Sequence, residues 1–166
     1  MIELERIGDE RGFFARSFAR DIFERSGLTG GFVESSISYN ARAGTLRGMH
    51  FQAPPHAEAK LVRCTRGAIF DVIVDLRPGS PTERRWVGAD LSMNNHRMLY
   101  VPEGFAHGFI TLEDNTEVFY EISQYYNVES ACGLRWDDPA VGIEWPRPPV
   151  VLSARDGSLP FLTSRT

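Results

Sequence analysis

The sequence predicts an all-β fold, a sandwich or barrel of short strands, and three observations support this prediction. Short runs rich in β-branched and aromatic residues recur through the middle of the chain, as expected for strands. Each run is bounded by Gly, Pro, Asn or Asp, residues that turns favour. The strand signal is stronger than the helical signal, and closely spaced short strands are typical of sandwiches and barrels.

The expected elements begin with one short helix. Arg20–Ser26 has apolar residues beside polar ones and ends near Gly27, a residue favoured after helix ends. Hairpin connections are expected at residues 77–82 and 92–96, because proline presets φ and Gly or Asn tolerates positive φ. The expected strands are Lys60–Cys64, Ala68–Leu76, Trp86–Leu91, Met98–Val101, Gly108–Thr111 and Val118–Ile122.

From residue 136 onward the chain is expected to form no long regular element. Prolines at positions 139, 146, 148, 149 and 160 interrupt both helices and strands. This tail is therefore expected to wrap over the core as turns and short extended pieces. Because no linker or internal repeat is recognisable, residues 1–166 are expected to form a single domain.

Composition indicates a soluble globular protein and argues against some classes of partner. The 166 residues are 42% hydrophobic and 24% charged, which suits a substantial core. A net charge of −4 and a pI near 5.6 argue against nucleic acid or an anionic membrane as the partner. No apolar run approaches the roughly 18 residues of a membrane span, and the first residues lack a signal-peptide pattern. We therefore expect a cytoplasmic protein in which Cys64 and Cys132 are free thiols.

One lysine stands out among the 18 basic residues. Lys60 follows closely after Arg47 and His50, in a chain that otherwise uses arginine. A lysine ammonium is a compact charge whose pKa moves on burial, whereas the arginine fork keeps its charge. Imidazole titrates nearest neutral pH, so His50 is a candidate general base. The alternatives are that Lys60 survives by chance and that His50 is a satisfied core histidine.

The other histidines lie in a turn and two loops. His107 ends a Pro-x-Gly-x-x-His pattern that resembles half of the signature of cupins, small β-barrels in which this histidine often binds a metal. The other half, a His-x-His pair, is missing, because the chain reads His-Phe-Gln from residue 50. A site of His50, His107 and Glu58 would be underfilled, so no metal is expected. A metal-dependent cupin oxygenase or isomerase using these residues stays an alternative. His56 and His96 are expected to be exposed and without a role.

Five motifs occur in order along the chain: Asp9–Phe14, Gly44–Gln52, Lys60–Cys64, Pro102–Phe109 and Trp136–Pro139. Together they resemble the dTDP-4-dehydrorhamnose 3,5-epimerase family, over about residues 9–161. The resemblance implies a metal-free cupin-type jelly roll with short peripheral helices, no cofactor, and a homodimer with strand exchange. It implies a nucleotide-linked substrate, a dTDP-linked 4-keto-6-deoxyhexose. The implied reaction is epimerisation at C3, C5 or both through an enolate, because both carbons flank the C4 ketone.

By this resemblance, four residues carry the chemistry. His50 is the base, and Asp156 orients it by accepting its second imidazole proton. Tyr120 is the acid on the opposite face of the sugar, although strand tyrosines more often serve packing. Lys60 stabilises the negative charge that develops on the ketone oxygen.

The resemblance also implies a set of substrate-binding residues. Arg11 and Arg47 match residues that hold the diphosphate through charge-assisted bonds. Phe14 matches a stacking surface for the base. The full implied set is Arg11, Phe14, Arg16, Glu34, Ser36, Arg47, Asp71, His107 and Tyr126.

Departures from the family pattern lie at the nucleotide end. Arg16 stands where the family usually has glutamate, and Glu34-Ser35-Ser36 stands where it favours Gln-x-Asn. Recognition of the base or sugar is therefore expected to differ. Few residues precede Gly8, which would weaken strand exchange. These changes keep open two alternatives, a non-catalytic nucleotide-sugar-binding cupin and an enzyme that inverts only C3.

Overall fold

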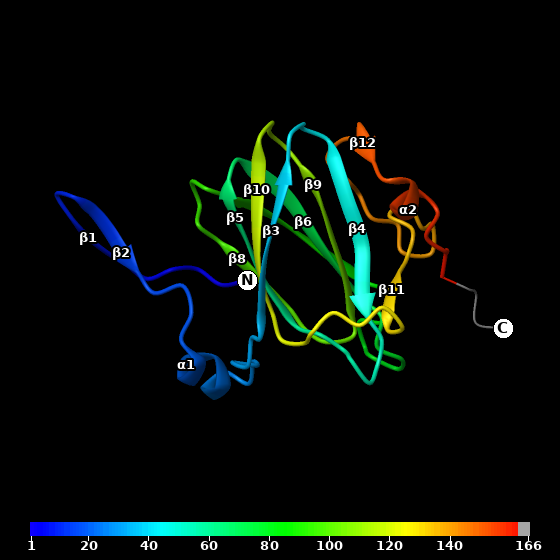
Figure 1. Ribbon diagram of the computed structural model, residues 1–166, viewed down its shortest axis with the longest axis horizontal. Helices are drawn as coiled ribbons and strands as arrows, with labels where there is room; N and C mark the ends of the chain where they lie inside the picture. The colour runs from blue at the N-terminus through cyan, green and yellow to red at the C-terminus, as the bar shows by residue number, and fades with distance from the viewer. Residues whose placement is uncertain (163–166) are drawn as a thin grey trace.

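The computed structural model describes residues 1–162 and contains two sheets packed face to face (Figure 1). The four-stranded sheet has the order β3 (Glu34–Asn40), β10 (Thr116–Ile122), β5 (Lys60–Arg66) and β8 (Met98–Val101). The larger sheet has the order β11 (Ala131–Gly133), β4 (Thr45–Gln52), β9 (Phe105–Thr111), β6 (Ala68–Asp75) and β7 (Trp86–Ser92). A short strand, β12 (Val151–Leu152), joins β4 in parallel, and the other pairings are antiparallel. The predicted all-β jelly roll is confirmed.

The hydrophobic core lies between the sheets and continues behind the larger one. Val62, Phe109 and Val118 are buried in the cluster between the sheets. A second cluster includes Val72 of β6 and, packed against it from the C-terminal tail, Trp145. Because both faces of the larger sheet are covered, β6 is a nearly continuous buried run rather than an alternating strand. The tail wraps over the core, as predicted.

The predicted strands are present, Met98–Val101 with its predicted bounds and the others with one end shifted. Helix α1 (Arg20–Arg25) lies within the predicted helix. The expected strands did not include β1 (Arg6–Asp9), β2 (Gly12–Ala15), β3, β4, β11 or β12. Of these, β3 pairs with β10 along its whole length. Its sequence, ESSISYN, is rich in serine, so its strand propensity is low and cross-strand pairing stabilises it instead. Helix α2 (Ala154–Gly157) was also not predicted.

Strand β4 has an irregularity that decides where two of its side chains point. In a regular strand, residues three apart point to opposite faces of the sheet. The pairing between β4 and β9 shifts register between Arg47 and His50. The two strands approach closely here, because a Cβ added at Gly48 would lie 2.6 Å from the Cα of Gly108. As a result of the shift, Arg47 and His50 both face the space between the sheets.

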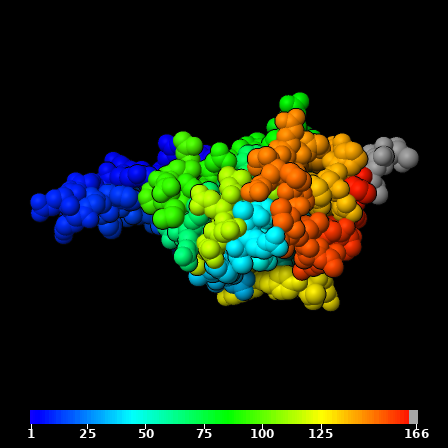
Figure 2. Space-filling model, turned by 90° about the horizontal axis from the view of Figure 1, so that it is seen from above, coloured from blue at the N-terminus to red at the C-terminus, as the bar shows by residue number. Residues whose placement is uncertain are grey.

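The N-terminal hairpin forms an arm that projects from one side of the body (Figures 1 and 2). It consists of β1 (Arg6–Asp9) and β2 (Gly12–Ala15), which pair with each other in a separate two-stranded sheet. Phe13 packs against the ring of His96, whereas Ile7 and Phe14 remain 71% and 64% exposed. The arm therefore presents apolar side chains that its own body leaves uncovered.

A search of residues 1–162 for membrane-crossing segments found no helix of sufficient length and apolar character.

Candidate active site

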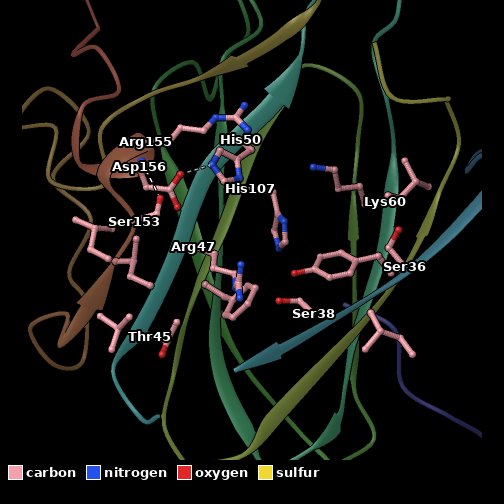
Figure 3. A pocket seen from close by; sticks show the side chains of 17 residues that line it. Ser36, Ser38, Thr45, Arg47, His50, Lys60, His107, Ser153, Arg155 and Asp156 are labelled. Carbon is pink, nitrogen blue, oxygen red and sulfur yellow. Dashed lines mark hydrogen bonds and ion pairs between the residues drawn. The ribbon is translucent and has the colours of Figure 1, made fainter. Parts of the chain in front are cut away.

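A cavity of about 540 Å³ lies between the two sheets, and both sheets and α2 contribute to its lining. In Figure 3, His50, Asp156 and Arg155 lie on one side of it and Lys60, Ser36 and Ser38 on the other. A second cavity of about 370 Å³ shares His50, Lys60, Ser36 and Arg155 with the first. The polar residues that line the first cavity are Ser36, Ser38, Thr45, Arg47, His50, Lys60, His107, Tyr120, Ser153, Arg155 and Asp156.

The His50 ring is held by a buried carboxylate. Nε2 of His50 lies 2.8 Å from Oδ1 of Asp156, whose side chain is 6% exposed. The other oxygen of Asp156 accepts a hydrogen bond from the Gly48 backbone at 3.3 Å, and Ser153 caps the short helix α2 at Asp156. Burial lowers the pKa of His50 below its ordinary value, although the contact with Asp156 opposes this shift. His50 is therefore neutral near pH 7, which is the form that a base requires.

Lys60 points into the cavity from the start of β5 and carries a carboxylate partner. Its Nζ lies 2.9 Å from Oε1 of Glu58, and both side chains are 11% exposed. The pair partly offsets the cost of burying the ammonium. Lys60 also contributes to the lowered pKa of His50, since two cations in one cavity disfavour each other.

Tyr120 of β10 enters the cavity from the four-stranded sheet, opposite the strand that carries His50. Its ring packs in a T-shaped arrangement against the ring of His107, with ring centres 6.1 Å apart. Nε2 of His107 lies 2.7 Å from Oδ1 of Asp71, which is fully buried. Burial raises the pKa of Tyr120 well above its usual range, and the negative charge of Asp71 adds to this shift. The Tyr120 phenol therefore stays protonated over the working pH range.

The three residues considered as metal ligands do not fit a metal site. His50, His107 and Glu58 each pair with a different charged group. Within residues 1–162, no group of three or more His, Cys, Asp or Glu side chains is placed to hold a metal ion. The donor set therefore does not favour the metal-dependent alternative.

The structure brings most of the predicted site residues together, but not all of them. His50, Asp156, Tyr120, Lys60, Arg47, His107 and Ser36 line the first cavity, and Glu34 and Tyr126 line the second. Asp71 lies behind His107 and does not line either cavity. The arm and the segment after it carry the remaining predicted residues, Arg11, Phe14 and Arg16, outside both cavities.

Two loop histidines differ from the exposure expected of them. His56 is half-buried, and its Nδ1 lies 3.0 Å from Oγ of Ser130. His96 is half-buried against Phe13 of the arm. Neither lines the two cavities described above.

Sequence reasoning missed four of the polar residues that line the first cavity, Ser38, Thr45, Ser153 and Arg155. Arg155 lines both cavities, and its charge contributes to the lowered pKa of His50. Its position next to Asp156 was a signal that could have identified it. Ser38 also lines this cavity, and its side chain lowers the pKa of Tyr120 against the effect of burial. Serine is too common in loops and strands for a similar signal to exist in the sequence.

Comparisons with known proteins agree with this geometry. The sequence model of one family, described as dTDP-4-dehydrorhamnose 3,5-epimerase, matches residues 1–164. An enzyme of that name from Sinorhizobium fredii (strain NBRC 101917 / NGR234) is 48% identical over 98% of this chain and 84% of its own length.

Two solved structures give the same result. The dTDP-4-dehydrorhamnose 3,5-epimerase of Bacillus anthracis, with TDP and PPi bound, has a TM-score of 0.92 at 48% identity, covering 96% of this chain and 91% of that one. A dTDP-6-deoxy-D-glucose-3,5-epimerase from Legionella pneumophila, in complex with dTDP-4-keto-L-rhamnose, has a TM-score of 0.88 at 40% identity, covering 96% and 85%. The cupin-type fold is thereby confirmed, and the protein is an enzyme. The chain belongs to the dTDP-4-dehydrorhamnose 3,5-epimerase family.

Proposed function

We propose that this enzyme epimerises a dTDP-linked 4-keto-6-deoxyhexose at C3, C5 or both. The observation that carries the proposal is that a base and an acid enter one cavity from opposite sheets. His50 projects from β4 of the larger sheet, and Tyr120 projects from β10 of the four-stranded sheet. A sugar ring between them would have one group on each face. Removing a proton from one face and returning a proton to the other inverts the carbon.

The proposed reaction proceeds through an enolate. Neutral His50 takes the proton from the carbon beside the C4 ketone, and the C–H electron pair moves into the enolate, whose charge rests on the C4 oxygen. The Lys60 ammonium, whose side chain is 11% exposed, stabilises that charge. Tyr120 then gives its proton to the same carbon on the opposite face, and the ketone reforms. Each inversion leaves His50 protonated and Tyr120 as a phenolate.

The nucleotide is proposed to extend from the first cavity into the second. Arg47 is held by a hydrogen bond from its Nε to Oδ1 of Asn40 at 2.7 Å, which fixes a guanidinium ready to bind the diphosphate. Glu34 and Tyr126 line the second cavity, where the nucleoside would lie. The nucleotides bound in the related structures support this class of substrate.

We propose that the enzyme is a homodimer in which the arm crosses to the second copy. Ile7 and Phe14 on the arm are exposed, as are Ile37 and Tyr39 on β3, which forms an edge of the four-stranded sheet. Apolar side chains on an arm and on a sheet edge are typical of surfaces that another chain covers. Crossing would deliver Arg11, Phe14 and Arg16 to the partner's site.

Mixed dimers test the crossing. A His50→Ala chain keeps an intact arm, and an Arg11→Ala chain keeps an intact His50. If the arm acts on the partner's cavity, mixing the two inactive or weakened variants restores one complete site per mixed dimer, and activity rises. No recovery in mixtures shown by mass to contain mixed dimers would show that the arm serves its own chain.

Heavy-water exchange tests the proposed reaction itself. With the dTDP-linked 4-keto-6-deoxyhexose in D₂O and chelator present, the enzyme is expected to introduce deuterium at C3, C5 or both, as read by NMR and mass spectrometry. His50→Gln should lose exchange, whereas the matched variant His56→Gln, which alters a histidine outside the cavities, should retain it. Exchange in His50→Gln at the rate of the unmodified enzyme would exclude His50 as the base. Deuterium at C3 alone would identify an enzyme that inverts one carbon.

We further propose that the reaction takes place in the cytoplasm, where free thiols such as Cys64 and Cys132 remain reduced.

A further inference from the structure

Two histidine–aspartate pairs meet in the cavity, and the proposed reaction uses one of them. His50 and His107 lie opposite each other in the ladder between β4 and β9. Each approaches a buried aspartate through Nε2, at 2.8 Å for Asp156 and 2.7 Å for Asp71. Both histidines line the first cavity (Figure 3). The second pair therefore has the construction of an acid–base group without an assigned task.

The surroundings of Tyr120 connect this second pair to the acid. The rings of Tyr120 and His107 are in T-shaped contact. The charge of Asp71, behind His107, acts on Tyr120 and adds to the effect of burial in raising its pKa. A phenolate at this position is consequently unstable, and its proton must be restored quickly. The group that restores it must be close and must titrate near neutral pH.

The other polar groups that act on Tyr120 do not meet that requirement. Arg47 carries a guanidinium, a group that does not serve as a proton donor in proteins. The Ser38 side chain also acts on Tyr120, but a hydroxyl is a far weaker acid than an imidazolium. The ring of His107 is in contact with Tyr120, and imidazole is the side chain that proteins most often use to transfer protons. An enzyme that inverts two carbons would need this restoration twice for each substrate molecule.

We propose that His107, positioned by Asp71, relays a proton to Tyr120 after each inversion. This inference rests on the proposed function. With Nε2 held by Asp71, Nδ1 takes a proton from water in the cavity, and the Asp71 carboxylate stabilises the imidazolium. The Nδ1–H bond then breaks as the O–H bond of Tyr120 forms, directly or through one water molecule, and the electron pair returns to Nδ1. His50 releases its own extra proton to solvent, so no proton is gained or lost.

Asp71 is a positioning residue in this scheme, because it does not line the cavity. Its second oxygen, Oδ2, is buried and has no hydrogen-bond partner among residues 1–162. The carboxylate therefore makes its side-chain hydrogen bond to His107 alone within this part of the chain. An asparagine at this position would remove the charge that favours the imidazolium while keeping the size of the side chain.

The test compares the first inversion with continuous turnover. In Asp71→Asn, with enzyme in excess over substrate, the first inversion uses the proton already on Tyr120 and should stay within about twofold of the unmodified rate. With substrate in excess, each later inversion waits for the relay, and the rate should fall by about tenfold or more. Rapid quenching and NMR of the product give both rates. Added imidazole buffer should partly restore continuous turnover by protonating Tyr120 from solution.

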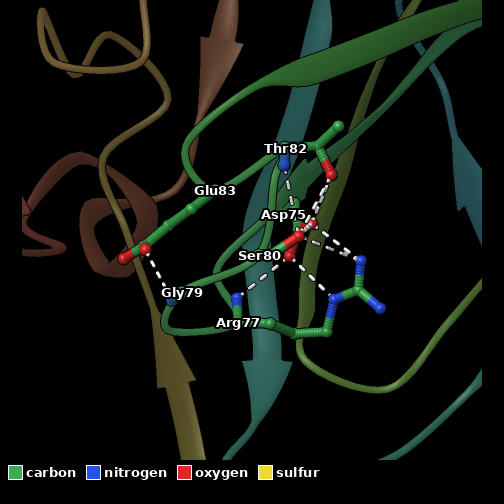
Figure 4. A network of polar contacts seen from close by, with 6 residues as sticks. All are labelled: Asp75, Arg77, Gly79, Ser80, Thr82 and Glu83. Atoms are coloured by element: carbon green, nitrogen blue, oxygen red, sulfur yellow. Dashed lines mark hydrogen bonds and ion pairs between the residues drawn. The ribbon is translucent and has the colours of Figure 1, made fainter.

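A matched control is available on the same strand. Asp75, also on β6, is buried, but it bonds to Arg77, Ser80 and Thr82 in the connection to β7 (Figure 4). Asp75→Asn should lower stability without changing the ratio of the two rates. If Asp71→Asn does not fold, the ratio of the two rates is measured in His107→Gln, because its amide cannot carry a proton.

Two results separate the inference from the proposed function. Equal losses of the first inversion and of continuous turnover in Asp71→Asn or His107→Gln would overturn the relay and leave these residues a structural role. The unmodified enzyme would still exchange and invert in that case. Absence of exchange in the unmodified enzyme would instead overturn the proposed function.

Discussion

Replacing Asp156 by asparagine tests how the base is activated. Asp156 accepts at both of its oxygens, from Nε2 of His50 at 2.8 Å and from the Gly48 backbone at 3.3 Å. An asparagine side chain has one acceptor oxygen, so it can keep one of these bonds and must present an amide to the other group. The backbone fold of α2 should survive, because the Ser153 cap bonds to the backbone of residue 156. The change therefore affects mainly the orientation and charge of His50.

The expected loss follows from the bond that is broken. A hydrogen bond to a charged group contributes about 1.5–3 kcal/mol, equivalent to about 10- to 150-fold in rate if fully expressed in the transition state. The side chain of His50 is 37% exposed, so water can replace part of the interaction. We therefore expect kcat/KM to fall by about 10- to 50-fold.

The pH dependence should move in a direction that a general loss of structure would not produce. His50 acts in its neutral form, so activity falls as pH decreases through its pKa, which burial holds below its ordinary value of 6.5. Asp156 opposes that lowering. Without its charge, the pKa of His50 falls further, and the acid limb of the profile should move to lower pH while the plateau also falls. A profile of kcat/KM against pH measures both. An acid limb that moves to higher pH, or an unchanged plateau, would refute this reasoning.

Three further predictions follow from other parts of the site and fold. Lys60→Met should lower kcat by about 10²- to 10³-fold with a smaller change in KM, because the Lys60 charge acts on the enolate. Steady-state kinetics measure both constants, and a rise in KM alone would contradict this prediction. Asp75→Ala should lower the free energy of unfolding in urea by about 2–4 kcal/mol. Arg77 is the chief cause that lowers the pKa of Asp75 in the folded protein. The stabilisation by the Asp75 carboxylate is therefore complete above its ordinary pKa of 3.8 and is lost as pH falls. An equal decrease in the free energy of unfolding at pH 2 and pH 7 would contradict this. Gly108→Ala would place a Cβ 2.6 Å from Sδ of Met49. The free energy of unfolding should therefore fall by about 1–3 kcal/mol, and activity should fall with it. Unchanged activity and melting temperature would contradict this and show that β4 and β9 can move apart.

The strands that could be predicted are those whose residues carry the signal themselves. Met98–Val101 was predicted with its observed bounds, and β5, β6, β7, β9 and β10 were each predicted with one end shifted. β3 could not be predicted, because its stability comes from pairing with β10, which lies far along the chain. The register shift between β4 and β9 could not be predicted from the sequence either. Regular alternation would place Arg47 and His50 on opposite faces.

The site shows the same division between local and long-range information. His50 could be singled out because imidazole ordinarily titrates near neutral pH, and Lys60 because it is the one lysine in the sequence. Asp156, the partner of His50, lies 106 positions away, and no spacing rule connects the two residues. They were paired only through the resemblance to the family. The arm illustrates the opposite case. Arg11 and Phe14 were predicted to bind substrate, yet they stand outside the cavities of their own chain, because their task depends on a second copy under the proposed function.

The stereochemistry of the proposed reaction is a consequence of the two-sheet architecture. A base and an acid on neighbouring residues of one strand could exchange protons with only one face of a ring. Here β4 and β10 belong to different sheets, so the core packing between them sets the distance between His50 and Tyr120. Both sheets are close-packed against that core, as the buried Phe109 and Val118 show. Inversion then needs no movement of the sugar beyond bringing each acidic carbon in turn between the two groups.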